Sequence, residues 1–154
     1  MSFREKTAWI AVLTTLAVWG YYFFAVWSGI EARALDGAAL WTLFLISMGI
    51  TVVLMVGLNL IAARRRLSDF GRAPDELERQ MEAGAARVSK TLFEWIVMGI
   101  ALVCVIWGRD IAAAFPSDPV GSFAIIVANG LLLAGVATNV LGEAIIIVRF
   151  RVIG

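Results

Sequence analysis

Two glutamates, Glu94 and Glu143, each lie inside a long apolar run of the sequence. An ionisable side chain in a membrane-spanning segment is costly, so each acid is a candidate functional group by default. Glu94 follows Lys90 by four residues and Glu143 precedes Arg149 by six. Helices that run in opposite directions would therefore place both acids at nearly the same depth, where they could face each other and exchange protons.

Three asparagines could donate hydrogen bonds to these carboxylates. Asn139 lies one turn before Glu143 and Asn129 two heptads before it, which predicts one shared polar face. Asn59, in a separate apolar run, is a further candidate donor. The alternative interpretation is structural, with Glu143 hydrogen-bonded or paired with an arginine and Glu94 reaching the headgroup layer.

A second strip of the last apolar run consists of small residues at a four-residue spacing, namely Gly130, Ala134, Thr138 and Gly142. This small-xxx-small pattern allows a second helix to approach closely in a membrane. We therefore expect the last helix to be the packing centre of the protein.

Residue types that support most metal and redox chemistry are scarce in this chain. It has no histidine and a single cysteine, Cys104, inside an apolar run. This composition excludes an intramolecular disulfide, a cysteine metal cluster and the usual axial haem ligand. No serine with a neighbouring base can be assembled either, so we expect no catalytic residues, no bound metal and no cofactor, and the protein is predicted not to be an enzyme.

The elements that must position these side chains are membrane helices. The chain has 154 residues, of which 61% are hydrophobic and 16% charged, whereas soluble domains have about 45–50% apolar and about 25% charged residues. Each apolar run is close to or above the roughly 20 residues that a helix needs to cross the hydrocarbon core. The runs cover residues 8–30, 40–63, 91–108 and 120–148.

The fold class that follows is all-α: a single integral membrane domain over residues 1–154, built as a four-transmembrane-helix bundle. Two hairpins are joined by a cytoplasmic amphipathic helix within residues 64–90. Pro74, Asp75 and Glu76 are typical of a helix start. We expect this helix to continue into the third apolar run with little interruption, and its mixed charge argues against nucleic-acid binding.

Local signals mark the two remaining connections and one half of the first helix. Asp36 and Asp118 are predicted to cap the second and fourth helices, with Pro119 in the first position of the fourth.

Aromatic residues crowd the second half of the first run, and they could either line a groove for a lipid-like or quinone-like ligand or only pack and form an interfacial belt. These residues are Trp19, Tyr21, Tyr22, Phe23 and Phe24.

The positive charges are distributed unevenly, and this predicts the orientation. Eleven of the 13 lysines and arginines lie at the two termini or in the central segment, and only Arg33 and Arg109 lie in the other two connections. Short loops rich in lysine and arginine stay in the cytoplasm, so both termini and residues 64–90 should be cytoplasmic.

Two short stretches resemble an uncharacterised family of small four-helix bacterial inner-membrane proteins. They are the segment from Phe3 to Trp9 (FREKTAW) and the segment Asp75-Glu76-Leu77-Glu78-Arg79 with Glu82, Gly84, Ala85 and Arg87. The resemblance implies a multi-pass location in the bacterial cytoplasmic membrane and supplies no activity or site residues. Small multidrug exporters have the same helix count, but their essential glutamate lies in the first helix, where this chain has no acid between Thr7 and Ile30.

Two functions are compatible with these observations. The first is an accessory, structural or partner-binding membrane subunit without catalytic chemistry, which either forms a homo-oligomer through the last helix or presents the helix of residues 74–90 to a membrane-protein partner. The second is a small proton-coupled carrier or channel that uses Glu143 and Glu94. An enzyme acting on a membrane lipid is a third and weaker possibility.

Overall fold

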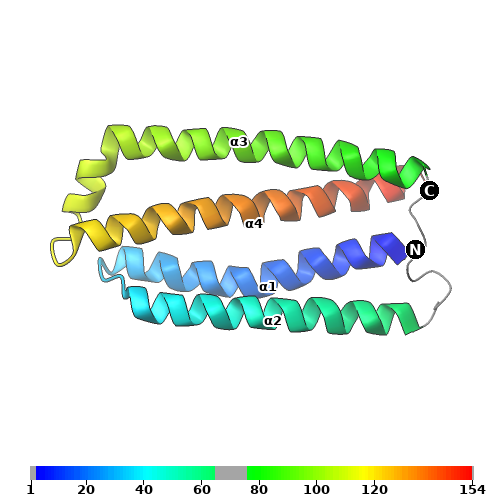
Figure 1. Cartoon of the computed structure of the whole chain (residues 1–154), viewed down its shortest axis with the longest axis horizontal. Coiled ribbons are helices and arrows are strands. Elements are labelled where there is room, and N and C mark those ends of the chain that lie inside the picture. The colour runs from blue at the N-terminus through cyan, green and yellow to red at the C-terminus, as the bar shows by residue number, and fades with distance from the viewer. Residues whose placement is uncertain (1–2, 65–75, 154) are drawn as a thin grey trace.

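The structure is a computed structural model that describes residues 3–64 and 76–153. These residues form four α-helices and no strand: α1 (Phe3–Glu31), α2 (Gly37–Arg64), α3 (Glu76–Ala113) and α4 (Pro119–Ile153) (Figure 1). All four are long and apolar enough to cross a membrane. The prediction of an all-α protein with four membrane-length helices is confirmed.

The helices extend well beyond the apolar runs, most of all in α3. The sequence predicted a third span over residues 91–108, but α3 has 38 residues and is therefore about 57 Å long at 1.5 Å per residue. The hydrocarbon core is only about 30 Å thick. Backbone hydrogen bonds of the helix continue beyond the last apolar side chains. The length of an apolar run therefore predicts the part of a helix that could cross a membrane, but not where the helix begins and ends. The predicted helix start at Pro74 and Asp75 lies outside the described residues.

The helices lie side by side in a row, in the order α2, α1, α4, α3 (Figure 1). In this row α1 packs against α2 and α4, and α4 packs against α1 and α3. The turns 32–36 and 114–118 lie at one end, here called the turn end, and the start of α1 and the end of α4 lie at the other, the terminal end. As a result, α1 and α4 are central, whereas α2 and α3 form the edges.

Local chemistry explains both turns. The Asp36 carboxylate accepts hydrogen bonds from the backbone N–H groups of Ala38 and Ala39 at 2.9 and 3.1 Å, and the Asp118 carboxylate accepts one from Gly121 at 3.0 Å. Both predicted N-caps are confirmed. At the end of α1, Arg33 has a φ of 51°, a left-handed conformation that helix ends usually give to glycine.

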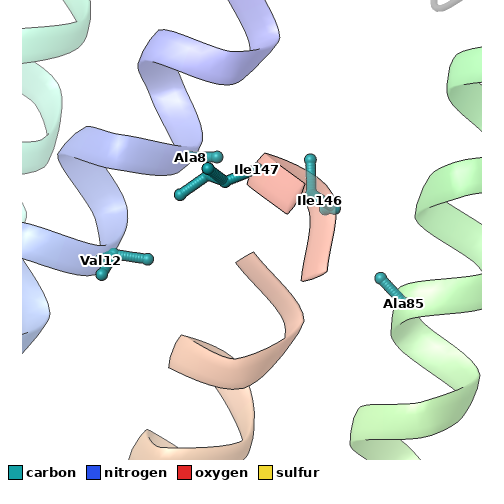
Figure 2. Close-up of a cluster of buried hydrophobic side chains, with 5 residues drawn as sticks. All are labelled: Ala8, Val12, Ala85, Ile146 and Ile147. Atoms are coloured by element: carbon teal, nitrogen blue, oxygen red, sulfur yellow. The ribbon is translucent and has the colours of Figure 1, made fainter. Parts of the chain in front are cut away.

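At the terminal end, α1, α3 and α4 meet around one cluster of small and branched side chains (Figure 2). Ile147 lies beside Ala8 of α1, while Ile146 lies on the side of α4 toward Ala85 of α3. Lipid tails are as apolar as these side chains, so close van der Waals packing, and not transfer from water, stabilises such a contact in a membrane. The same contact holds the first turns of α1 next to the last turns of α4, where the charged side chains gather.

Candidate functional site

Glu143 is joined to Arg4, a residue at the opposite end of the chain. The guanidinium Nη1 of Arg4 lies 3.2 Å from Glu143 Oε2, and Nη2 lies 3.4 Å from Oε1. Arg4 Nε also donates to Glu82 Oε1 at 2.6 Å. We call these three residues the Arg4 clamp, because one guanidinium of α1 binds a carboxylate of α4 and a carboxylate of α3.

The Arg4 clamp neutralises the charge of Glu143, whose side chain is largely buried. The Arg4 and Glu143 side chains are 26% and 20% exposed, and a fork of parallel N–H groups is the geometry in which arginine binds a carboxylate best. Leaving either charge unpaired at this depth would be costly. The structural interpretation of Glu143, an acid paired with an arginine, is the arrangement observed.

Two further arginines secure the same end of the bundle. Arg151 Nε lies 3.6 Å from Glu5 Oε1, and its guanidinium lies 5.6 Å from the centroid of the Trp9 ring, a cation–π contact. Arg149 donates to the backbone carbonyl of Met81 at 3.1 Å. It can do so because its guanidinium occupies the space beside Gly84, where any side chain would collide with it.

Glu94 is in a different environment. Its side chain is 60% exposed, and Oε1 lies 3.9 Å from Nζ of Lys90, one turn away on the same helix. Ser89 and Phe93 are the neighbouring side chains that meet α4, so Glu94, one residue further on, points away from it. The expectation that Glu94 and Glu143 face each other is wrong. Glu94 points away from α4, and because Ser89 lies beside Gly142 and Phe93 beside Gly135, Glu94 also lies about two turns from the level of Glu143.

The three asparagines are also separated. Asn129 Oδ1 accepts a hydrogen bond from the Tyr22 hydroxyl at 2.6 Å, and Asn129 Nδ2 donates to the Ile125 carbonyl at 2.9 Å. Asn139 is exposed, and the buried Oδ1 of Asn59 has no hydrogen-bond partner among the described residues. The predicted polar face therefore divides, with Glu143 and Asn129 bonded to α1 and Asn139 turned outward.

The small-residue strip of α4 lies against α3. Ala134 and Thr138 are buried, and the Thr138 hydroxyl donates to the Ala134 carbonyl at 2.8 Å. A Cβ atom on Gly142 would lie 2.7 Å from Ser89 Oγ, and one on Gly130 would lie 3.7 Å from Ile100. The strip is thus occupied within the chain and is not a free surface for another copy.

A groove at the turn end forms a second candidate site. It has a volume of about 360 Å³ and lies between α1, α2 and α4. Two of its lining residues, Tyr22 and Asn129, were singled out in the sequence, but the residues that α2 contributes were not anticipated. We call it the Trp41 groove, and it is lined by Tyr22, Gly37, Leu40, Trp41, Phe44, Ile125, Ala128, Asn129 and Leu132.

Sequence reasoning missed the two side chains that bind the candidate polar residues. Arg4 was counted only as one of the positive charges that set orientation, and Tyr22 only as one of several aromatics. Each lies more than 100 residues from its partner, at separations of 139 and 107 positions. No local spacing rule connects residues so far apart, so no sequence signal marked them.

Within the residues that the structure describes, no group of three or more aspartate, glutamate, cysteine or histidine side chains could hold a metal ion. Comparison of the chain with models of protein families, with curated proteins and with solved structures finds no significant match. A function is therefore inferred from the arrangement of the chain's own residues.

Proposed function

We propose that this protein is a non-catalytic, multi-pass subunit of the bacterial inner membrane that binds other membrane helices through its edge helix α2, with both termini in the cytoplasm. The observation behind this proposal is the open row of helices. A closed four-helix bundle gives every helix two neighbours, whereas α2 packs mainly on α1 and leaves most of its apolar surface exposed.

Two glycines on α2 support this assignment. A Cβ atom on Gly49 or Gly57 would meet nothing within 4 Å, so no contact within the described part of the chain requires glycine there. Glycine in a helix costs about 1 kcal/mol relative to alanine. In membranes this cost is offset where the missing side chain lets a partner helix approach closely.

The proton-coupled carrier is supported less well. Glu143 is neutralised by Arg4, and Glu94 is exposed beside Lys90. A proton site needs a carboxyl group that exchanges its proton along a path, and neither environment offers the pair of facing acids on which the carrier hypothesis relied. A structural role for Glu143 fits the Arg4 clamp better.

The proposal can be tested by photocrosslinking in native membranes. A benzophenone amino acid at Val53, which is 70% exposed between the two glycines, should give a protein adduct of discrete mass, either with a second copy or with another membrane protein. The matched position is Leu13 on central α1, which is 59% exposed and should yield only lipid adducts.

A double substitution, Gly49→Ile with Gly57→Ile, should abolish the Val53 adduct, whereas Gly20→Ile, at an equally open glycine of α1, should not. Lipid adducts alone at Val53 would contradict partner binding through α2. Equal loss with Gly20→Ile would mean that the effect does not come from the α2 surface.

A further inference from the structure

The Trp41 groove starts at the first turn of α2 and follows the beginning of its apolar run. Gly37 is the first residue of α2, and Phe44 lies seven residues, or about 10 Å, further along the helix. The groove therefore extends from the headgroup level into the hydrocarbon, where no water is present to solvate polar atoms. Its lining therefore favours a largely apolar occupant that enters from the bilayer.

One polar pair lies in this otherwise apolar groove. Tyr22 and Asn129 both line it, and the Tyr22 hydroxyl donates to Asn129 Oδ1 at 2.6 Å. Asn129 uses one of its two amide hydrogens on the Ile125 carbonyl. The second amide hydrogen and the lone pairs of the Tyr22 oxygen remain available, and in hydrocarbon a polar group gains most from a partner that reaches it.

The walls of the groove are aromatic and one ring is uncovered. Trp41 and Phe44 stack with centroids 5.5 Å apart and planes 18° from parallel, and Tyr22 meets Phe44 at 6.2 Å, edge to face. Trp41 is 60% exposed. The exposed indole of this stacked pair favours a further flat ring, since aromatic rings gain about 0.5–1.5 kcal/mol from such contacts beyond burial of area.

From these two features we propose that the Trp41 groove binds a flat ring with hydrogen-bonding oxygen atoms and an apolar tail, the chemistry of an isoprenoid quinone. The ring lies against Trp41, a ring oxygen accepts the free amide hydrogen of Asn129, and the tail leaves sideways into the bilayer. A lipid acyl chain would fill the same volume but would use neither the aromatic face nor the amide donor. The volume of the Trp41 groove, about 360 Å³, lies within the range of about 300–1,000 Å³ typical of small-molecule sites.

A second cavity serves as an internal control. It has a volume of about 440 Å³ between α3 and α4, and Ile96, Gly99, Ile100, Phe123 and Val127 are among the residues that line it. Its lining has no hydroxyl or amide side chain and no indole, and its one side-chain donor is the weak S–H of Cys104. We expect this cavity to hold only lipid chains.

The experiment uses the full chain in phosphatidylcholine nanodiscs and a photoreactive azido-benzoquinone with a ten-carbon tail, with the labelled peptides mapped by mass spectrometry. Labelling should fall within residues 37–44 and 125–132. Unlabelled decyl-benzoquinone should compete with it, whereas decanol, which has the tail without the ring, should not. Competition by decanol as strong as by the quinone would mean that the groove holds an acyl chain only, and would overturn the proposal.

Substitutions then separate the groove from the control cavity. Ala128→Leu fills the Trp41 groove and should lower labelling about tenfold or more, while Gly99→Leu, placed in the α3–α4 cavity, should leave labelling unchanged. Tyr22→Phe and Asn129→Leu keep the volume but remove polar atoms, and each should weaken binding about three- to tenfold, as expected for one hydrogen bond. Thermal unfolding of each variant provides the folding control.

Wild-type labelling in Ala128→Leu, or equal loss in Gly99→Leu, would place the probe outside the groove and overturn the proposal. If Ala128→Leu fails to fold, Asn129→Leu decides, because it removes the amide hydrogen that the ring oxygen accepts. Unchanged affinity in Tyr22→Phe and Asn129→Leu together would exclude the polar pair from recognition and would likewise overturn the proposal.

Discussion

Arg4 and Glu143 are 139 residues apart in the chain, yet their side chains form an ion pair at 3.2 Å. The pair joins the first turn of α1 to α4, and through Glu82 it also reaches α3. It therefore connects both central helices and one edge helix at the terminal end, and it is the contact whose removal should affect the bundle most.

Glu143→Gln should lower the free energy of unfolding by about 2 kcal/mol, because glutamine keeps the shape but leaves the half-buried Arg4 guanidinium without a countercharge. Arg4→Gln should cost a similar amount, and the double variant should be less destabilised than the sum. Equilibrium unfolding in bilayer-like bicelles measures these values. Glu94→Gln is the control and should cost less than about 0.5 kcal/mol, as for an exposed pair. Wild-type stability of Glu143→Gln would show that the clamp contributes little.

Gly142→Ala should be destabilising although alanine favours helices, because its Cβ would lie 2.7 Å from Ser89 Oγ. Ser89→Ala removes that oxygen and leaves a Cβ at 3.7 Å, an ordinary contact. In the Ser89→Ala background, Gly142→Ala should therefore become neutral or stabilising by up to about 1 kcal/mol. Gly20→Ala, at an open position of α1, should be stabilising in either background. An additive result for Gly142 and Ser89 in the same unfolding assay would rule out this contact as the cause.

Arg33→Gly should stabilise the protein by about 1 kcal/mol, since glycine adopts the left-handed conformation of this helix end without a Cβ penalty. Arg109→Gly removes a positive charge from the same end of the bundle but lies within α3, where glycine costs about 1 kcal/mol. The two variants should shift the thermal unfolding midpoint in opposite directions. A shift in the same direction would point to charge and not backbone conformation.

Asp36→Ala and Asp118→Ala should each lower the free energy of unfolding by about 1 kcal/mol, the usual cost of losing an N-cap. Asp36→Asn should cost far less, because the amide oxygen can still accept the bonds from Ala38 and Ala39. Asp110→Ala, an exposed site inside α3, is the matched control with a change below about 0.5 kcal/mol. If all three aspartate-to-alanine variants unfold alike, capping is not the source of stability at these turns.

The orientation can be tested by cysteine labelling of intact cells in a Cys104→Ser background. Ser117→Cys lies in the exposed turn between α3 and α4, and Ala83→Cys lies on an exposed face near the terminal end. An impermeant thiol reagent added from outside should label only Ser117→Cys, because the positive charges gather at the terminal end. Labelling of Ala83→Cys in intact cells, with Ser117→Cys protected, would show that the terminal end faces outward and would contradict the predicted orientation.

The sequence by itself determined the features that depend on neighbouring residues. Apolar run length determined that there are four membrane-length helices, because a helix crossing hydrocarbon must satisfy its backbone within its own segment. Asp36 and Asp118 could be identified as caps because each bonds to N–H groups two or three residues away. The four-residue spacing of Gly130, Ala134 and Thr138 likewise gave one face of α4 from helix geometry alone.

Only the tertiary structure decided which helices are neighbours and how each is rotated. Residue counts predicted nearly the same depth for Glu94 and Glu143, but both the register and the rotation of α3 against α4 depend on which side chains pack together, and the observed contacts place the two acids about two turns apart. In a bilayer, lipid competes equally for every apolar face, so small differences in van der Waals fit select the partner. For that reason the pairs Arg4–Glu143 and Tyr22–Asn129, the order α2, α1, α4, α3 and the Trp41 groove emerge only when the helices are assembled.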